Sequence, residues 1–147
     1  MLIRTADLSD LRDIFEWRND FFSRSMFLNS EVVSLNDHID WYHRYLKKPH
    51  KIIYIGSINK LKVGMVRFDF DEDTMQSEVS INLNPSLRGK GFGLKLLSKS
   101  ISIYKQSKDT PLIATVKKGN DSSLRTFTKF GFHNKYEDDL CYHLILS

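Results

Sequence analysis

A glycine-rich segment between an expected strand and an expected helix constrains the fold of this 147-residue chain more than any other feature. Polar and apolar side chains alternate over residues 78–83, as in a strand with one buried face. Pro85 follows, and then the run Arg88-Gly89-Lys90-Gly91-Phe92-Gly93. Apolar residues at helical spacing predict a helix over residues 91–107. Free backbone N–H groups at the start of such a helix form an anion-binding site, here suited to a pyrophosphate.

Two common phosphate-binding motifs fit this segment less well. A dinucleotide-binding fingerprint has the spacing G-x-G-x-x-G, whereas Gly89, Gly91 and Gly93 have the spacing G-x-G-x-G. A P-loop ends in Gly-Lys-Ser/Thr, but here Gly91 follows Lys90. For the segment taken alone, a glycine-rich turn without a ligand stays an alternative.

The other periodic segments predict one α/β or α+β domain over residues 1–147, with the element order βααβββαβαββ. Strands are expected at residues 2–6, 52–55, 63–70, 78–83, 112–116, 132–136 and 142–146. Helices are expected from about residue 8 to 19, from the Ser34 cap to Pro49, and over residues 91–107 and 122–130. Residues 23–31 are expected to form a loop, and Gly56 to end a strand.

Composition and charge exclude several classes of protein. Apolar residues make up 41% of the chain and no apolar run approaches the roughly 18 residues of a membrane span. The N-terminus does not have the pattern of a signal peptide. The net charge of +4 is mild and forms no polybasic tract, so nucleic-acid binding is not expected. The single cysteine, Cys141, cannot form an internal disulfide, which favours a cytoplasmic location.

Two motifs, in this order, resemble those of the GNAT N-acetyltransferase superfamily. The run Arg88-x-x-Gly91-x-Gly93 is similar to the coenzyme-A loop of that family, Arg/Gln-x-x-Gly-x-Gly/Ala. The run Asn120-x-x-Ser123-x-x-x-Phe127-x-Lys129-x-Gly131-Phe132 is similar to its second motif, Asn-x-x-Ala/Ser-x-x-x-Tyr-x-Lys-x-Gly-Phe. One helix and one strand separate the two motifs, as in the family.

The resemblance implies a fold with a mixed sheet of about seven strands and four helices, in which two central parallel strands splay apart. These strands would be residues 78–83 and 112–116. Residues 1–50 would form the acceptor side, and residues 76–132 the acetyl-CoA-binding core.

The resemblance also implies acetyl-CoA as co-substrate. Pantetheine would pair with the backbone near Leu83, and the pyrophosphate would lie on the N–H groups of residues 88–93. The implied cofactor-binding residues are Leu83, Arg88, Gly89, Lys90, Gly91, Phe92, Gly93, Asn120, Ser123 and Phe127. No metal is expected, since no His, Cys and carboxylate cluster has ligand spacing.

The catalytic groups are assigned by resemblance and plausibility. Glu78 is expected to be the general base, acting through water, because a partly buried carboxylate can take a proton near neutral pH. A solvated strand glutamate is the structural alternative. Ser80 and Asn82 share its face of the strand, so this face is expected to line the acceptor pocket. The backbone N–H of Leu83 is the implied oxyanion donor.

Phe127 departs from the family pattern, which usually has a tyrosine at this position. Phenylalanine has no proton to donate, but a thiol titrates at about 8.5, so a thiolate leaves tolerably without an acid. Tyr104, Tyr142 and a water held by Asn120 stay open as substitutes. We expect Phe127 to pack against the pantetheine arm.

The acceptor side resembles two branches of the superfamily, which acetylate nucleotide-linked amino sugars or the N-terminal alanine of ribosomal proteins. The segments Trp17-Arg18-Asn19 and His38-x-x-Trp41-Tyr42 carry this resemblance. The implied substrate-binding residues are Arg18, Asn19, Arg24, His38, Trp41 and Tyr42. The structural alternatives are that Trp17 and Trp41 belong to the core, that Arg18 forms a surface ion pair, and that His38 is structural.

The predicted activity is therefore N-acetylation of a small-molecule amine, with a nucleotide-linked amino sugar as the first choice. A protein N-terminus is the alternative acceptor, and a weakly catalytic CoA-binding module is the alternative class, suggested by Phe127. Neither nucleic acid nor a membrane is an expected partner, and a homodimer is left open.

Overall fold

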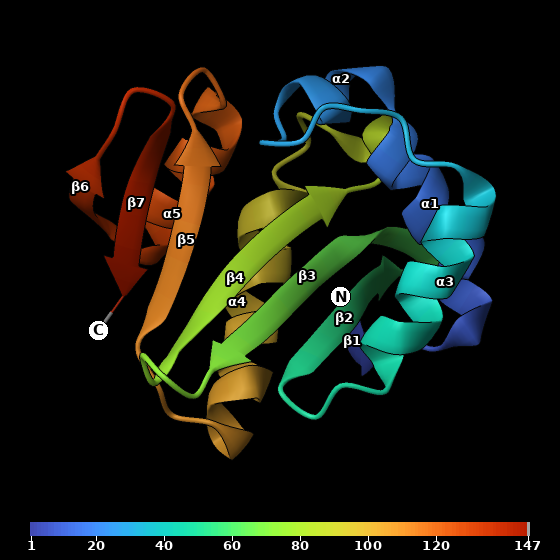
Figure 1. The fold of residues 1–147 in the computed structure, drawn as a ribbon, viewed down its shortest axis with the longest axis horizontal. Helices are drawn as coiled ribbons and strands as arrows, with labels where there is room; N and C mark the ends of the chain where they lie inside the picture. Colours follow the sequence, from blue (N-terminus) through green and yellow to red (C-terminus); the bar gives the residue numbers. More distant parts are fainter. Residues whose placement is uncertain (147) are drawn as a thin grey trace.

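The computed structural model describes residues 1–146 and consists of one mixed sheet with helices on both faces (Figure 1). The strands are β1 (Leu2–Thr5), β2 (Lys51–Ile58), β3 (Leu61–Asp71), β4 (Gln76–Leu83), β5 (Leu112–Lys117), β6 (His133–Glu137) and β7 (Cys141–Leu146). Their order in the sheet is β1-β2-β3-β4-β5-β7-β6. Only β4 and β5 are parallel neighbours, and all the other pairs are antiparallel.

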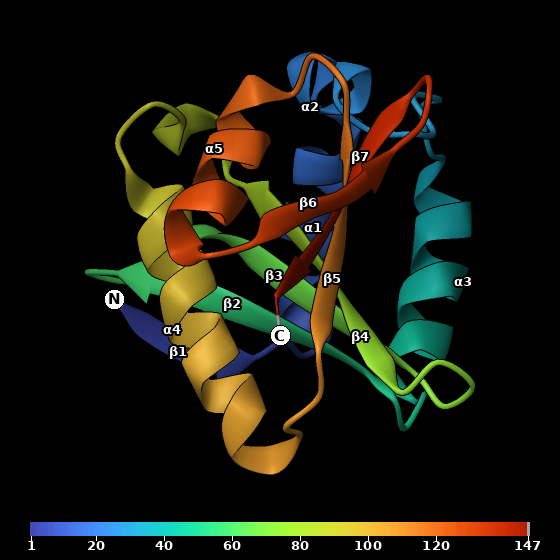
Figure 2. The same cartoon turned by 90° about the vertical axis from the view of Figure 1, so that its left-hand side faces the viewer.

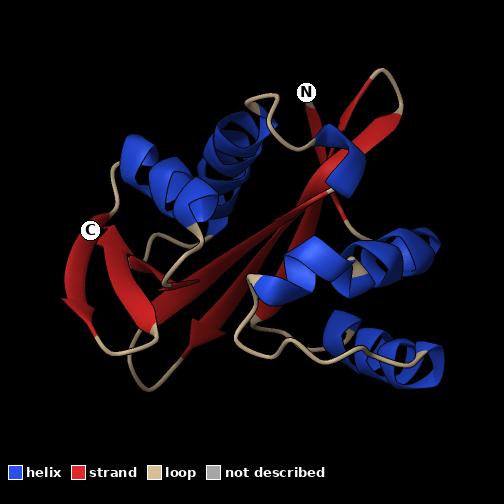
Figure 3. Ribbon diagram, turned by 90° about the horizontal axis from the view of Figure 1, so that it is seen from above, coloured by secondary structure: helices blue, strands red, loops and turns tan. Residues whose placement is uncertain are grey.

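The helices cover the two faces of the sheet separately, as Figure 2 and Figure 3 show. The helices α1 (Leu11–Asn19), α2 (Phe21–Ser25) and α3 (Leu35–Leu46) come from the N-terminal third of the chain, whereas α4 (Phe92–Ser107) and α5 (Asp121–Phe130) follow later. Two short 3-10 turns, η1 (Leu8–Asp10) and η2 (Pro85–Leu87), precede α1 and α4.

Each face has its own apolar core. Val66, Phe68 and Val79 of the sheet pack with α4 and α5. Ile53, Ile55 and Met65 pack on the other face with α1 and α3. Successive side chains of a strand point to opposite faces of the sheet. Because helices cover both faces of the central strands, each face has a core of its own.

The central strands part after a short contact. β4 and β5 pair only at Ser77 with Leu112 and at Glu78 with Ile113. Beyond these positions the two strands diverge toward their C-terminal ends (Figure 1). The splayed pair that the family resemblance implied is therefore present, at the two predicted strands.

Most predicted elements and caps are confirmed. Asn120 caps α5 by accepting a hydrogen bond from the Ser123 N–H at 3.2 Å, and Ser34 caps α3 through the Asp37 N–H at 3.1 Å. Gly131 follows α5 with φ +130°, which favours glycine.

Two local predictions are wrong. The expected loop over residues 23–31 overlaps α2, whose N-terminus is capped by Asp20 through the Ser23 N–H at 3.0 Å. Gly56 does not end its strand, because β2 continues to Ile58 with a register shift after Gly56. A Cβ at Gly56 would lie 2.5 Å from Cδ1 of Leu96, so a larger residue there must displace the Leu96 side chain of α4.

Within residues 1–146, none of the helices is both long and apolar enough to cross a membrane.

Candidate active site

A cavity of about 330 Å³ lies where β4 and β5 part. One wall is the sheet, formed by residues 78–82 of β4 with Thr115 and Lys117 of β5. The acceptor-side wall comes from α1, α3 and residues 26–29, and the remaining wall from the start of α5. The cavity thus connects the segment that is expected to bind acetyl-CoA with the segment that is expected to bind the acceptor.

The register of β3 and β4 fixes which side chains face this cavity. Glu78, Ser80 and Asn82 lie opposite Asp69, Arg67 and Met65, respectively. Paired residues project to the same face of a sheet, and Met65 belongs to the core under α1 and α3. The predicted shared face of Glu78, Ser80 and Asn82 is therefore the acceptor-side face, and all three line the cavity.

Glu78 is more exposed than the sequence prediction supposed. It lines the cavity but is exposed, whereas we expected a partly buried carboxylate. Within residues 1–146 its carboxylate has no ion pair and no protein hydrogen bond. A carboxylate in this position can accept a proton through solvent, which is the geometry that a water-mediated base needs.

The backbone N–H of Leu83 points into the gap between β4 and β5. Leu83 lies opposite Gly64, and the Asn84 N–H donates to the Val63 carbonyl at 2.8 Å. In an antiparallel ladder this pattern makes Leu83 and Gly64 a non-hydrogen-bonded pair. The Leu83 N–H is therefore directed away from β3, toward the edge from which β5 has diverged.

The glycine-rich loop has the backbone of an anion cradle. Gly89 and Gly91 have φ values of +74° and +79°, in the left-handed region that favours glycine. Gly91 is the N-cap of α4, and no side chain within residues 1–146 caps this helix. The first N–H groups of a 16-residue helix are thus free to hold a pyrophosphate.

Gly93 lies inside α4, on the side of the helix that faces α5. It is buried, and a Cβ on it would lie 3.6 Å from Oγ1 of Thr126. The neighbouring Phe92 is half-buried, and Lys90 is exposed.

The side chain of Arg88 is engaged by α2. Its Nη2 donates hydrogen bonds to the carboxylate of Asp20 and to Oγ of the buried Ser23. Its guanidinium also lies 4.9 Å from the ring centroid of Phe22. Although burial of Asp20 opposes the effect, the hydrogen bonds that its carboxylate accepts from Arg88 and from the Ser23 N–H lower the pKa of the Asp20 carboxyl group. Arg88 thus fastens the cradle to the acceptor side, while its backbone N–H donates to the Pro85 carbonyl at 3.4 Å.

Residues of the second motif lie at the cavity. Asn120, Ser123 and Phe127 all line it. Phe127 is 2% exposed and meets Phe132 edge-on, with the ring centroids 5.0 Å apart. It therefore packs against Phe132 and lines the cavity, and its packing against the pantetheine arm stays a prediction.

The two tyrosines that were candidate replacement acids are not at the cavity. Tyr104 is buried on the α4 face of the sheet, where its hydroxyl lies 2.7 Å from Oγ of Ser77. Burial raises the pKa of Tyr104, which makes it a poorer acid still. Tyr142 does not line the cavity either.

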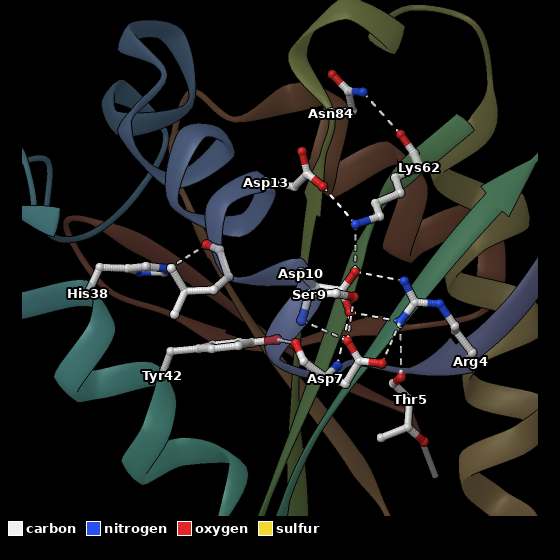
Figure 4. A network of polar contacts seen from close by, with 11 residues as sticks. Arg4, Thr5, Asp7, Ser9, Asp10, Asp13, His38, Tyr42, Lys62 and Asn84 are labelled. Atoms are coloured by element: carbon white, nitrogen blue, oxygen red, sulfur yellow. Dashed lines mark hydrogen bonds and ion pairs between the residues drawn. The ribbon is translucent and has the colours of Figure 1, made fainter. Parts of the chain in front are cut away.

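The predicted acceptor residues fall into two groups. Arg18 and Trp41 line the cavity, with the Arg18 Cζ 4.9 Å from the Trp41 ring centroid. His38 and Tyr42 are completely buried. Nε2 of His38 lies 2.9 Å from the Leu11 carbonyl, and the Tyr42 hydroxyl donates to the Asp7 carbonyl at 2.6 Å (Figure 4). These two side chains hold α3 against the N-terminal segment and leave no surface for a substrate.

Asn19 and Arg24 organise the loop at the cavity rather than line it. The side-chain amide of Asn19 accepts a hydrogen bond from the Val33 N–H and donates one to the Val33 carbonyl, each at 2.8 Å. Arg24 donates to the carbonyls of Asn19 and Ser30 at 3.2 and 3.0 Å. Together they fix residues 26–33, part of which covers the cavity.

Sequence reasoning missed Arg67, which lines the cavity from β3. The signal was present, since Arg67 is a charged residue between Val66 and Phe68 in an apolar strand. Its position opposite Ser80 depends on a strand register that the sequence alone does not give. Within residues 1–146 no cluster of His, Cys, Asp and Glu could hold a metal ion.

A free helix N-terminus, an unpaired strand edge and an acceptor-side cavity together define an acyltransferase that uses a coenzyme-A donor. The family model for the acetyltransferase (GNAT) domain matches residues 1–133. The chain therefore belongs to the GNAT acetyltransferases, as its two motifs predicted, and acetyl-CoA is its co-substrate.

Individual relatives are distant. The L-methionine sulfoximine/L-methionine sulfone acetyltransferase of Salmonella typhimurium is 26% identical over 137 residues, which are 90% of this chain and 80% of the relative. The spermidine N-acetyltransferase of Vibrio cholerae, solved with CoA and spermine, superimposes with a TM-score of 0.87 at 15% identity, over 99% of this chain and 94% of the other. The N-acetyltransferase PseH of Campylobacter jejuni superimposes with a TM-score of 0.76 at 18% identity, over 99% of this chain and 96% of the other.

Proposed function

We propose that this enzyme acetylates the primary amine of a small acceptor that binds in the cavity at the β4–β5 gap. The observation that supports this most is the cavity itself. It touches Asn120 of the donor side and Arg18 of the acceptor side, and Glu78 of β4 also lines it. Donor and acceptor can therefore meet beside a carboxylate.

In this proposal, groups of the protein take the amine proton, stabilise the oxyanion and bind the pyrophosphate. Glu78 takes the amine proton through a water molecule, which leaves the nitrogen lone pair free for attack. The Leu83 N–H donates to the oxygen that becomes negative in the tetrahedral transition state. The thiolate departs without a side-chain acid, in keeping with Phe127 at the usual tyrosine position. The free N–H groups at Gly91 and after it hold the pyrophosphate.

Two acceptor classes have support. A nucleotide-linked amino sugar, our first choice, is favoured by the partly exposed Trp41 ring, on which a base or sugar can stack. An amino acid is favoured by the relative that acts on L-methionine sulfoximine and L-methionine sulfone. Neither requires a homodimer, since one chain supplies the cavity walls. We place the enzyme in the cytoplasm, because its one cysteine, Cys141, is buried and unpaired.

A thiol-release assay with acetyl-CoA tests the proposal. The panel contains a UDP-linked amino sugar, L-methionine sulfone, spermidine and an alanine-terminated peptide. We expect release with at least one small amine and none without an amine. Tight CoA binding with no release for any amine would instead indicate a CoA-binding module, and release with the peptide alone would indicate a protein N-terminal acetyltransferase.

A further inference from the structure

Arg18 lies in the wall of the cavity without the partners that a buried guanidinium normally has. Its Nη1 is buried and donates no hydrogen bond within residues 1–146, and no carboxylate of that part of the chain forms an ion pair with it. The ring of Trp41 lies against it, with the ring centroid 4.9 Å from Cζ. An unmet N–H on a buried cation is costly, so a site that retains one is suited to a ligand.

Arg67 is the second cation at the same wall. Its Nε is buried and makes no hydrogen bond, although it lies 3.3 Å from Oδ2 of Asp69. Asp69 is shared, because the Tyr45 hydroxyl donates to it and Nζ of Lys51 lies 3.6 Å away. One carboxylate therefore serves several donors, and the wall keeps an excess of positive charge.

The two guanidinium groups affect each other. Burial and the charge of Arg67 both lower the pKa of Arg18. Two cations that face one cavity repel, and an anionic group between them would turn this repulsion into attraction. Carboxylate and phosphate oxygens match the fork of N–H donors that a guanidinium presents.

We propose that the acceptor carries an anionic oxygen group in addition to its amine, and that Arg18 and Arg67 hold this group. The proposal rests on the proposed function and specifies the acceptor of the same cavity. The spacing suits a small molecule: Arg67 lies opposite Ser80, so Glu78 is its diagonal neighbour on the same face, roughly 7 Å away. An amine at Glu78 and an anion at Arg67 can thus belong to one amino acid or amino sugar.

A second cavity of about 200 Å³ continues from this wall. It shares Trp41 and Arg67 with the first cavity, and its other lining residues are Arg44, Tyr45, Lys48, Lys51 and Asp69. A carboxylate next to the amine would reach only Arg18 and Arg67. A phosphate farther from the amine would also reach Arg44 and Lys48, so these two residues separate the two sources of the anion.

The test compares amines that carry an anionic group with neutral amines, in which this group is missing. The pairs are L-methionine with L-methioninamide, and glucosamine 6-phosphate with glucosamine. The variants are Arg18→Gln and Arg67→Gln, with Arg67→Lys in case the glutamine variant does not fold. Arg12→Gln is the matched control, since Arg12 is exposed on the same helix as Arg18. Each change is compared within one acceptor, so the different basicity of the paired amines cancels.

We expect Arg18→Gln and Arg67→Gln to raise KM for the anionic acceptors by about 10- to 100-fold, as the loss of a charge-assisted hydrogen bond does. KM for the neutral amines and for acetyl-CoA should stay within about twofold, and Arg12→Gln should change nothing. An equal loss for anionic and neutral acceptors would overturn the proposal, as would a wild-type enzyme that prefers spermidine.

Arg44→Gln with Lys48→Gln identifies the source of the anion. A further loss confined to glucosamine 6-phosphate indicates a phosphate, whereas no further loss with either acceptor indicates a carboxylate next to the amine. Calorimetry of the same pairs on the CoA-saturated protein needs no turnover. Arginine-dependent binding of the anionic amines without thiol release would support the anion site while refuting the proposed transferase. Equal binding of the anionic and neutral amines would refute the anion site.

Discussion

Glu78 and Leu83 are the two positions where single groups carry the proposed chemistry, and they lie on one strand with the cavity beside them. The sequence placed both on β4 and put Ser80 and Asn82 on the face of Glu78. It did not indicate the exposure of Glu78, because burial depends on how far the loop over residues 26–29 covers the strand. The same holds for His38 and Tyr42, which look like site residues until α3 is seen to bury them.

Replacement of Glu78 by Gln tests the base. The isosteric amide cannot take a proton, so we expect kcat to fall by about 100-fold while the affinity for CoA stays unchanged. Steady-state kinetics and calorimetry with CoA measure the two quantities. Glu16→Gln, at an exposed position of α1, is the control and should leave both unaltered. A pH–rate profile identical to that of the wild type would exclude Glu78 as the base.

Gly91 tests the cradle. A carboxylate introduced by Gly91→Glu would lie against the pyrophosphate, and we expect CoA affinity to fall by about 100-fold or more, since like charges in contact cost several kcal/mol. Gly91→Asn is the matched control, because asparagine tolerates the left-handed φ of +79° and adds no charge. Calorimetry should show near-normal CoA binding for Asn. Equal binding by the Glu and Asn variants would contradict the cradle.

At the scale of elements, the strand and helix order followed from periodicity alone, but the splay of β4 and β5 did not. Only the resemblance to a family implied it, because a pattern of alternating residues says nothing about where two strands stop pairing. The helix α2 was missed since its five residues, Phe21–Ser25, are too few to show a period. Its role becomes apparent only through tertiary contacts, when Arg88 is seen to bond Asp20 and Ser23.

Gly64 tests the coupling between β3 and the oxyanion donor on β4. A Cβ at Gly64 would lie 2.6 Å from the Asn82 carbonyl oxygen and 2.9 Å from Cα of Leu83, so Gly64→Ala must displace the backbone of β4. We expect a loss of about 1–3 kcal/mol in the free energy of unfolding and a fall in kcat of about tenfold or more.

The control for this variant is Gly56→Ala, measured by the same urea titrations and steady-state assays. It crowds the side chain of Leu96 instead of β4, so it should reduce stability and leave kcat near the wild-type value for the folded enzyme. If both alanine variants reduce kcat to the same degree, crowding in general explains the effect, and the special position of Leu83 is refuted.

At the scale of the whole molecule, an ionic network around a buried carboxylate joins the N-terminal segment to the sheet and to α1 (Figure 4). Asp10 is fully buried and receives two hydrogen bonds of 2.7 Å from Arg4. Nζ of Lys62 lies 2.8 Å from Asp10 and 2.7 Å from Asp13. Burial alone would raise the pKa of Asp10, but the hydrogen bonds from Arg4 and Lys62 outweigh it and lower the pKa to about 2.

This network makes stability depend on acid. Because the pKa of Asp10 is lower in the folded than in the unfolded chain, its ionised form stabilises the fold at neutral pH, by about 2 kcal/mol. That contribution should disappear as the pH falls from about 4 to about 2. Urea unfolding at a series of pH values, for the wild type and Asp10→Asn, measures it.

The comparison between the wild type and Asp10→Asn isolates the contribution of the Asp10 carboxylate to stability. Asp138, whose pKa is also held at about 2 by its hydrogen bond to His143, titrates in the same range in both proteins and cancels. The difference in unfolding free energy should therefore shrink toward low pH. A difference that stays constant from pH 7 to pH 2 would refute the assignment.

The central claim is that the cavity at the β4–β5 gap brings an acetyl donor and an amine together. The most direct test incubates the enzyme with acetyl-CoA labelled in its acetyl group and a mixture of small amines, and locates the label by mass spectrometry. We predict that the label appears on the nitrogen of one acceptor and that Glu78→Gln greatly slows its appearance. Label that remains on CoA, or appears only as free acetate, would contradict the claim.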